Sequence, residues 1–433
     1  MCGRSPERAG DDDLMRVLWA KANKILPVSS GGDIRSYNLL RQLAASDQVT
    51  FLSYYDGEVD RQYEANLGKQ LPGCICVSTG KKLDSRFARG MDYVRRLPQD
   101  APYAVSRFAS RKVRDCLRRA IFATRPDVVV CDFLDAAINF PKRLPVPSIL
   151  FQHNVESEIW RRRAENASTP LKRQIFKREY SKMLRYERAM VAKFDRVISV
   201  SEHDRTLMSR WVDASRIDVV PTGVDLSQFQ SSDFCGSNSK LVVFVGAMDW
   251  EPNIDGVEYF HTTVWPSVIA KIRDARFRIV GRNPDARVRK LQGVNVEVTG
   301  SVPSVVNHLR DAAIVVVPLR IGGGTRLKIY EAMAAGRAVV STTVGAEGLD
   351  INPGKDIWIA DEPLEMAHAV TQLLDDGELR GRFGRAAADQ AARFDWSAVA
   401  GKFRQILCKT ARATAAAKVG EEIVSAGVSW RGM

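Results

Sequence analysis

The chain has 433 residues and a formal net charge of +13, and 45% of its residues are hydrophobic and 27% charged. This length suits about two or three domains, and the composition excludes a mainly disordered or collagen-like protein. The seven cysteines are scattered without a CxxC pair, so neither a zinc ribbon nor a disulfide framework is predicted.

The first half of the chain alternates apolar segments with helical patterns. The segments expected to hold strands are 14–22, 49–55, 126–137, 148–154, 196–208 and 217–225, and basic helical regions cover 85–123 and about 155–193. Because the strand segments are apolar throughout rather than alternating, they indicate a parallel sheet covered by helices on both faces.

Residues 221–240 are rich in Gly, Ser, Asp and Asn, and the same pattern begins again after them. This composition predicts a domain boundary. The second series has strand segments at 241–248, 277–284, 294–300, 313–319, 338–343 and 356–360, with helices near 255–272, 303–311, 326–335, 363–376 and 378–393. We therefore expect an α/β protein of two doubly wound halves, in which ligands bind at the carboxyl ends of the strands.

The positive charge is concentrated in two stretches. Residues 81–119 hold twelve Lys and Arg against four Asp, and residues 155–193 hold eleven against five Glu. These stretches are either solvated helix faces or a surface for a polyanion, an acidic substrate or an anionic membrane. A nucleic-acid module is not recognisable, so no nucleic-acid partner is predicted.

One hypothesis places the second basic stretch on the anionic inner leaflet of a membrane, with Trp160 and Phe176 at the interface. The cations of this hypothesis are Arg161, Arg162, Arg163, Lys172, Arg173, Lys177, Arg178 and Lys182.

The segment 318–336, PLRIGGGTRLKIYEAMAAG, is the most informative one for chemistry. A glycine run between a buried strand and a helix lets the backbone approach a ligand closely, and the free N–H groups of the helix start favour an anion. Two cations follow an expected threonine N-cap. Cations at the start of a helix interact unfavourably with the helix dipole, and a bound anion would compensate for this effect. A diphosphate is the candidate ligand, although a plain flexible loop is compatible with the glycines. The residues concerned are Gly322, Gly323, Gly324, Thr325, Arg326 and Lys328.

Glu331 lies on the second turn of the same predicted helix. A carboxylate there can accept hydrogen bonds from two vicinal hydroxyls, such as those of a ribose. Neither GxGxxG nor GxxxxGK[ST] follows the first strand, which argues against a classical dinucleotide domain and a P-loop kinase.

At this point the sequence resembles a known family over residues 14–408. The motifs that carry the resemblance are SSGGDIRSYNLLRQLA, FQHNVES, RVISVSEHDR, VVPTGVDLSQF, VVFVGAMDWEPNIDGVEYF, RIVGRNP, VTGSVPSVVNHLRDA and PLRIGGGTRLKIYEAMAAGRAVVSTTVGAEGL. They are similar to those of the family 4 type of retaining sugar transferases with the GT-B fold. The subtype resembles the enzymes of bacterial exopolysaccharide and envelope-glycan clusters.

The resemblance implies two Rossmann-like domains that face a central cleft. We expect an acceptor-side domain over residues 14–222 and a nucleotide-sugar domain over 223–394. A helix over 395–410 is expected to pack back toward the first domain. Residues 1–13 are expected to be a disordered tail and residues 411–433 a flexible one.

The resemblance also assigns roles to single residues. His153 would contact the transferred sugar, although a lone histidine is otherwise a common structural residue. Arg326 and Lys328 would bind the diphosphate and Glu331 the ribose. Gly31 and Gly32, in the loop after the first strand, would pack against the diphosphate or admit the acceptor, and their alternative interpretation is a tight turn. The nucleotide pocket would also include Gly246, Arg282 and Val302.

The implied reaction is transfer of a hexose or N-acetylhexosamine from a nucleoside diphosphate sugar to a glycan or lipid-linked acceptor. We expect no cofactor and, because no Asp-x-Asp motif occurs, no metal. A cytoplasmic protein is expected, and the basic stretches leave a peripheral position on the inner face of the plasma membrane open. A nucleotide-sugar epimerase, which keeps the fold and changes the chemistry, stays as an alternative. Many relatives carry a carboxylate at the position of Gly323, so a non-catalytic nucleotide-sugar scaffold is a second alternative.

Overall fold

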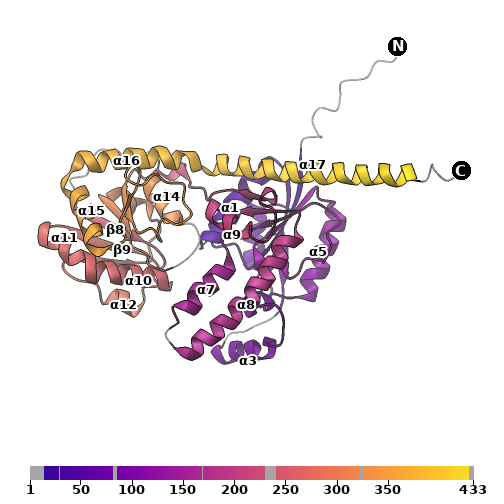
Figure 1. The fold of residues 1–433 in the computed structure, drawn as a ribbon, viewed down its shortest axis with the longest axis horizontal. Helices are drawn as coiled ribbons and strands as arrows, with labels where there is room; N and C mark the ends of the chain where they lie inside the picture. Colours follow the sequence, from indigo (N-terminus) through magenta and orange to yellow (C-terminus); the bar gives the residue numbers. More distant parts are fainter. Residues whose placement is uncertain are drawn as a thin grey trace, which may run out of the picture. The chain divides into compact units, whose positions relative to one another are not determined.

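The computed structural model describes residues 14–28, 30–80, 85–167, 169–229, 240–321 and 326–428. The chain divides into two compact units, which we call unit 1 (Met1–Val220 and Ala400–Met433) and unit 2 (Pro221–Val399). Each unit has its own sheet and its own apolar core (Figure 1). In the described ranges, no helix combines the length and the apolar composition needed to cross a bilayer.

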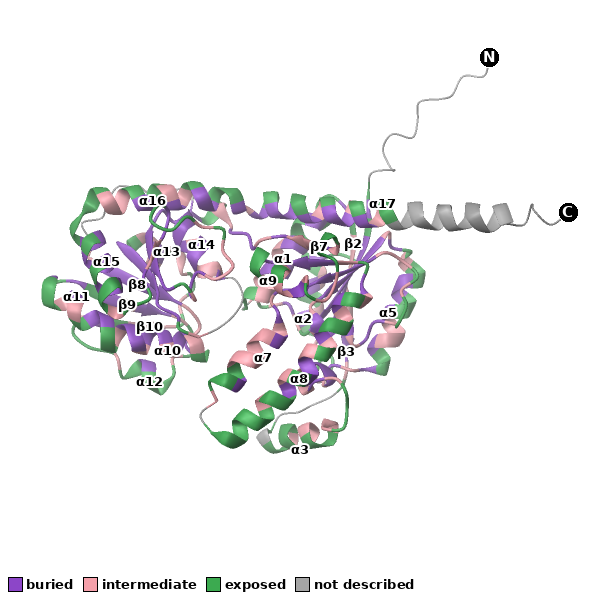
Figure 2. Cartoon of the chain, in the orientation of Figure 1, coloured by how far each residue is buried: buried purple, intermediate pink, exposed green. Residues whose placement is uncertain are grey.

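Unit 1 is built on a parallel sheet. Its strands in the described part of the chain are β1 (Arg16–Ala22), β2 (Gln48–Tyr55), β3 (Ile75–Ser78), β4 (Val128–Asp132), β5 (Ser148–Phe151), β6 (Arg196–Ser199) and β7 (Ile217–Val219). Their order across the sheet is β3-β2-β1-β4-β5-β6-β7. The central strands β4 and β5 are buried along their whole length, as expected for a sheet covered on both faces. Figure 2 shows the strands of the sheets largely in the purple of buried residues.

The helices of unit 1 that precede the last strand of its sheet are α1 (Gly31–Ala44), α2 (Arg61–Gln70), α3 (Arg86–Arg96), α4 (Tyr103–Ser106), α5 (Arg111–Thr124), α6 (Leu134–Ala137), α7 (Glu156–Glu165), α8 (Pro170–Lys193) and α9 (Glu202–Met208). The helical region expected over 85–123 is divided into α3, α4 and α5, because Pro98 and Pro102 cannot continue a helix. The second basic region is divided into α7 and α8. Thr169 caps α8 by accepting a hydrogen bond from the Lys172 N–H at 3.3 Å.

Unit 2 repeats this architecture. Its strands in the described ranges are β8 (Leu241–Val245), β9 (Arg276–Val280), β10 (Val296–Gly300), β11 (Ile314–Val317), β12 (Ala338–Ser341) and β13 (Trp358–Ile359). They lie in the order β10-β9-β8-β11-β12-β13, and neighbours pair in parallel. The two parallel sheets with interleaved helices confirm the predicted α/β class.

The helices of unit 2 are α10 (Glu251–Tyr259), α11 (Trp265–Lys271), α12 (Ala286–Arg289), α13 (Val306–Asp311), α14 (Leu327–Ala334), α15 (Pro363–Asp375) and α16 (Gly377–Ala391). The helix expected near 255–272 is interrupted by a π-helical turn over Phe260–Val264, just before Pro266. The helix expected over 326–335 begins at Leu327. Arg326 is its N-cap residue, and Thr325 lies outside the described residues.

Helix α17 (Trp396–Val428) is longer than the helix expected over 395–410, and most of it belongs to unit 1. Its Phe403 is fully buried. The Phe403 ring centroid lies 5.3 Å from that of Trp19 in β1 and 5.1 Å from that of Phe151 in β5. A segment from the end of the chain thus completes the core over the first sheet.

We expect Phe403→Ala to lower the free energy of unfolding by about 3–5 kcal/mol, because a large aromatic side chain is lost from a closed core and leaves a cavity. Urea unfolding measures the change. Lys402→Ala, at an exposed position on the same helix, is the matched control and should stay within about 0.5 kcal/mol of the wild type. Similar small effects for both variants would contradict the packing of α17 on the sheet.

Candidate functional site

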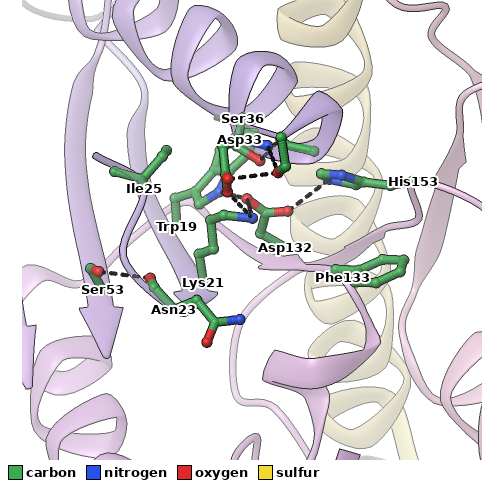
Figure 3. Close-up of polar contacts among 12 residues, drawn as sticks. Trp19, Lys21, Asn23, Ile25, Asp33, Ser36, Ser53, Asp132, Phe133 and His153 are labelled. Carbon is green, nitrogen blue, oxygen red and sulfur yellow. Dashed lines mark hydrogen bonds and ion pairs between the residues drawn. The ribbon is translucent and has the colours of Figure 1, made fainter. Parts of the chain in front are cut away.

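Three chemically active side chains meet at the carboxyl edge of the sheet in unit 1. Lys21 is in β1 and pairs in register with Asp132, the last residue of β4, and Asp132 pairs with Phe151 of β5. His153 follows β5 by two residues. Because these strands are neighbours and parallel, their ends bring the three side chains together (Figure 3).

Asp132 is the centre of this group and is 1% exposed. Its Oδ2 accepts a hydrogen bond from Trp19 Nε1 at 2.9 Å and lies 3.8 Å from Lys21 Nζ. Its Oδ1 lies 2.8 Å from His153 Nε2. Burial raises the pKa of the Asp132 carboxyl, but Lys21 and His153 outweigh this effect and hold the pKa well below its ordinary value.

His153 is 7% exposed and neutral near pH 7, because burial lowers its pKa to about 4 against the opposing pull of Asp132. The contact between His153 Nε2 and Asp132 Oδ1 is short but not aligned as a linear hydrogen bond. With Nε2 toward the carboxylate, the tautomer protonated at Nε2 is favoured, which leaves Nδ1 as a hydrogen-bond acceptor.

The Nδ1 side of this ring faces the start of α1. A Cβ added to Gly32 would lie 3.0 Å from Nδ1, closer than an ordinary contact. Gly31 and Gly32 were expected in a loop, but they are the first two residues of α1, because the hydroxyl of Ser30 caps the helix by accepting from the Asp33 N–H. Neither glycine has a positive φ, so the tight-turn interpretation is wrong. Close approach to His153 is the physical reason for a glycine at position 32.

A hollow of about 420 Å³ opens in unit 1 between the segment after β1 and the start of α2. Lys24 lies in it, with its ammonium 4.9 Å from the Tyr55 ring centroid and 5.2 Å from that of Tyr63. Amide side chains of α2 provide both donors and acceptors on the opposite wall. The lining residues are Lys24, Leu26, Pro27, Asp60, Gln62, Tyr63, Asn66 and Gln70.

In unit 2, a lysine is held at the corresponding edge of the sheet. Lys328, on the first turn of α14, places Nζ 2.8 Å from Asn253 Oδ1 and 4.3 Å from the Phe244 ring centroid. A Cβ added to Gly246, the residue after β8, would lie 2.7 Å from Nζ. A glycine at this strand end is therefore needed to admit the ammonium group.

Charged groups surround Lys328. Burial and, to a lesser degree, Arg326 lower the pKa of Lys328 to about 7 against the opposing effect of Glu331. Arg326 is 6% exposed, and its guanidinium carbon lies 5.5 Å from the Trp250 ring centroid. Burial also raises the pKa of Glu331, against the effect of Lys328. Two cations and one carboxylate thus share a poorly solvated region at the start of α14.

The other predicted donor-binding residues of unit 2 are placed less specifically. Arg282 has an exposed side chain, and its carbonyl accepts a hydrogen bond from the Met248 N–H at 2.9 Å. Val302 is half-buried and packs against the core of unit 2. Within the described part of the chain, no contact links the Arg282 side chain to Lys328. Outside the described residues lie Gly322, Gly323, Gly324 and Thr325.

Sequence reasoning missed several side chains that shape the two edges, namely Trp19, Lys21, Asp132 and Asn253. Asp132 had a usable signal, since a carboxylate that ends an apolar strand lies at the same edge of the sheet as His153. Asn253 had none, because its neighbour Lys328 is distant in the sequence. Among the described residues, no group of three or more His, Cys, Asp or Glu side chains is arranged to hold a metal ion.

Comparison with known proteins agrees with this division of the chain. Residues 29–228 match the family described as Glycosyltransferase Family 4, and residues 239–376 match the family described as Glycosyl transferases group 1. The two matches follow one another along most of the chain, and the similar solved structures include glycosyltransferases of the GT-B fold. The chain therefore belongs to the family 4 type of glycosyltransferases with the GT-B fold.

Individual relatives are distant. A phosphatidyl-myo-inositol mannosyltransferase of Mycolicibacterium smegmatis is 26% identical over 220 residues, which are 48% of this chain and 56% of that protein. The chain spans about half the length of the curated relatives it matches.

Two solved structures share the fold at low identity. Sucrose-phosphate synthase of Thermosynechococcus elongatus has a TM-score of 0.68 at 16% identity, over 92% of this chain and 100% of that one. Anabaena HepE, solved in complex with UDP-glucose, has a TM-score of 0.63 at 13% identity, over 91% of this chain and 100% of that one.

The contact between Gly32 and His153 gives a prediction on stability. Gly32→Ala should destabilise the protein by about 1–3 kcal/mol, because the added methyl group must displace the buried imidazole. Gly68→Ala, inside α2 with open space around the new Cβ, is the control and should stabilise by about 0.5–1 kcal/mol. Urea unfolding of both variants is the measurement, and a stabilising effect of Gly32→Ala would rule out the close approach.

Proposed function

We propose that the protein transfers a hexose or N-acetylhexosamine from a nucleoside diphosphate sugar to a glycan or lipid-linked acceptor in bacterial envelope or exopolysaccharide synthesis, with retention of the anomeric configuration. The observation that carries this proposal is the arrangement at the start of α14, where the buried Arg326 and the half-buried Lys328 lie beside the half-buried carboxylate of Glu331.

The two cations suit a diphosphate. Cations at a helix amino terminus oppose the dipole, and burial adds to their electrostatic strain. An anionic ligand relieves both effects and raises the pKa of Lys328 from its value of about 7. When the anomeric C–O bond breaks, negative charge develops on the leaving diphosphate. Arg326 and Lys328 would stabilise that charge from fixed positions, a contribution worth about 3–4 kcal/mol for one well-placed donor.

Glu331 suits the ribose of the nucleotide. Desolvation raises the pKa of Glu331, and two vicinal hydroxyls would supply hydrogen-bond donors to its carboxylate. Gly246 would leave room for the nucleotide beside Lys328, as it does for the ammonium group. Arg282 and Val302 stay predictions for the nucleotide pocket.

His153 suits the transferred sugar, because a neutral imidazole can accept a hydrogen bond from a sugar hydroxyl through Nδ1. Asp132 would fix the orientation of the ring. The hollow beside Lys24 offers amide and carboxylate groups to an acceptor glycan. We propose that neither a metal nor a cofactor takes part, and that the protein acts in the cytoplasm.

The comparisons support the choice of substrates. HepE was solved with UDP-glucose, a nucleoside diphosphate sugar. The mycobacterial relative is named a phosphatidyl-myo-inositol mannosyltransferase. That name describes the transfer of a mannosyl group to a lipid with a sugar-alcohol headgroup. UDP-glucose is therefore a suitable first probe for the donor, and lipid-linked glycans are suitable acceptors to screen.

Thermal-shift screening of nucleoside diphosphate sugars, beginning with UDP-glucose, tests the proposal. We expect a donor to raise the Tm of the wild type. Glu331→Ala and Arg326→Ala should each abolish that shift. Arg276→Ala, an exposed arginine at the opposite, amino end of a strand in unit 2, should leave it unchanged.

The outcomes separate the competing functions. Binding lost in both site variants, with sugar transfer to an acceptor, supports the transferase. Conversion of the donor without an acceptor would instead indicate an epimerase, and binding without any turnover would indicate a scaffold. A full Tm shift in Glu331→Ala would contradict the site.

A further inference from the structure

Helix α3 exposes an apolar stripe. Phe87, Met91 and Val94 are 77%, 60% and 62% exposed. At about 100° per residue their positions fall within a sector of roughly 60° on one side of the helix. Tyr93 points to a different side, where its hydroxyl lies 3.3 Å from Glu179 of α8. The helix is therefore anchored to unit 1 by one face and leaves its apolar face in water.

The beginning of α8 exposes two more large apolar side chains. Leu171 is 72% exposed and Ile175 is 36% exposed, on the first two turns of the helix. The C-terminal end of α3 is fixed next to them. Leu97, the residue after α3, accepts hydrogen bonds through its carbonyl from Arg178 at 3.2 Å and Lys182 at 2.7 Å. At about 1.5 Å per residue, Ile175 lies within one turn of Arg178.

Cations surround these apolar groups. Arg89 and Arg95 are exposed on α3, and Lys172, Arg173 and Lys177 are exposed on α8. In the part of the chain that the structure describes, none of these five forms an ion pair with a carboxylate. We call the five cations, together with Phe87, Met91, Val94, Leu171 and Ile175, the α3–α8 surface.

The surface differs from the one expected from the sequence. Trp160 and Phe176, predicted to meet a membrane, pack against each other with ring centroids 6.0 Å apart. Arg161 forms ion pairs with Glu158 and Glu165 of its own helix. Lys182 is buried and donates to two backbone carbonyls. Of the original cations, Lys172, Arg173 and Lys177 belong to the α3–α8 surface, and the original set contained no residue of α3.

We infer that the α3–α8 surface binds an anionic lipid bilayer, with Phe87, Met91 and Val94 inserted among the acyl chains and the five cations at the headgroups. Charge complementarity favours this occupant. An apolar stripe on an anchored helix, flanked by cations that have no carboxylate partner among the described residues, fits the boundary between headgroups and hydrocarbon, where the cations stay hydrated near phosphate. A buried protein interface would leave these cations desolvated. The inference deepens the proposed function, because it would bring unit 1 to a lipid-linked acceptor.

Vesicle co-sedimentation at low salt tests this inference. The vesicles contain phosphatidylcholine alone, or equal parts of phosphatidylcholine and phosphatidylglycerol. We expect the full-length protein to bind only the anionic vesicles. The triple variant Phe87→Ser, Met91→Ser, Val94→Ser should bind them at least about tenfold more weakly, since apolar burial is lost. Each of Lys172→Gln, Arg173→Gln and Lys177→Gln should weaken binding about fivefold.

Matched controls show whether a loss of vesicle binding is specific to the α3–α8 surface. Phe122→Ser removes an 82% exposed phenylalanine from α5 of the same unit, and it should bind as the wild type does. The Tm of every variant checks folding. The Tm shift with UDP-glucose should be the same in the triple-serine variant and the wild type, so that loss of vesicle binding is distinguishable from failure of the donor site.

Three results would overturn the inference. The first is equal binding of the wild type to neutral and anionic vesicles. The second is unchanged vesicle binding by the triple-serine variant. The third is a dimer of the wild type that the three serines dissociate, because the stripe would then be covered by a second copy of the chain.

Discussion

A lysine ammonium held away from water at the edge of the second sheet is the constraint on which the account depends. Lys328 is enclosed by Asn253, Phe244 and the glycine at position 246, and Arg326 adds a second positive charge beside it. A protein gains no stability from two adjacent buried cations. Their position after a parallel strand, at the edge where ligands of such sheets bind, is the basis of the proposal that they bind an anion.

The edge of the first sheet has a different electrostatic design. There a buried carboxylate, Asp132, lies beside the buried Lys21, and Trp19, Lys21 and His153 all direct polar groups at it. The charges of this group balance one another without a ligand. The group holds His153 as a neutral imidazole in a fixed orientation. The difference between the two edges supports a charged donor group at unit 2 and an uncharged sugar at unit 1.

Much of the fold could be predicted from the sequence, because continuous apolar runs indicate buried parallel strands. Part of the candidate site could also be predicted, because Arg326, Lys328 and Glu331 lie in one short segment. Contacts between distant segments did not follow. Asp132 meets His153 through strand register, and Phe403 reaches Trp19 only because α17 packs on the first sheet. Short helices replaced the expected long ones where prolines fall.

The α3–α8 surface shows a further reason why sequence alone was insufficient. The apolar residues of α3 have the spacing of a core-facing helix, and the sequence does not say which side of the helix meets the protein. The hydrogen bonds of Tyr93 and Leu97 help to fix that side, and they leave the stripe of Phe87 exposed. The aromatic pair chosen from composition is packed internally instead.

Proton uptake on donor binding tests the central claim most directly. Calorimetric titration with UDP-glucose, or the donor found by screening, in buffers of different ionisation enthalpy at about pH 8 counts the protons exchanged. With a free pKa of about 7, Lys328 is mostly neutral at that pH, and a bound diphosphate should return its proton. We predict uptake close to one proton in the wild type and none in Lys328→Met. Buffer-independent binding heats for the wild type would contradict the account.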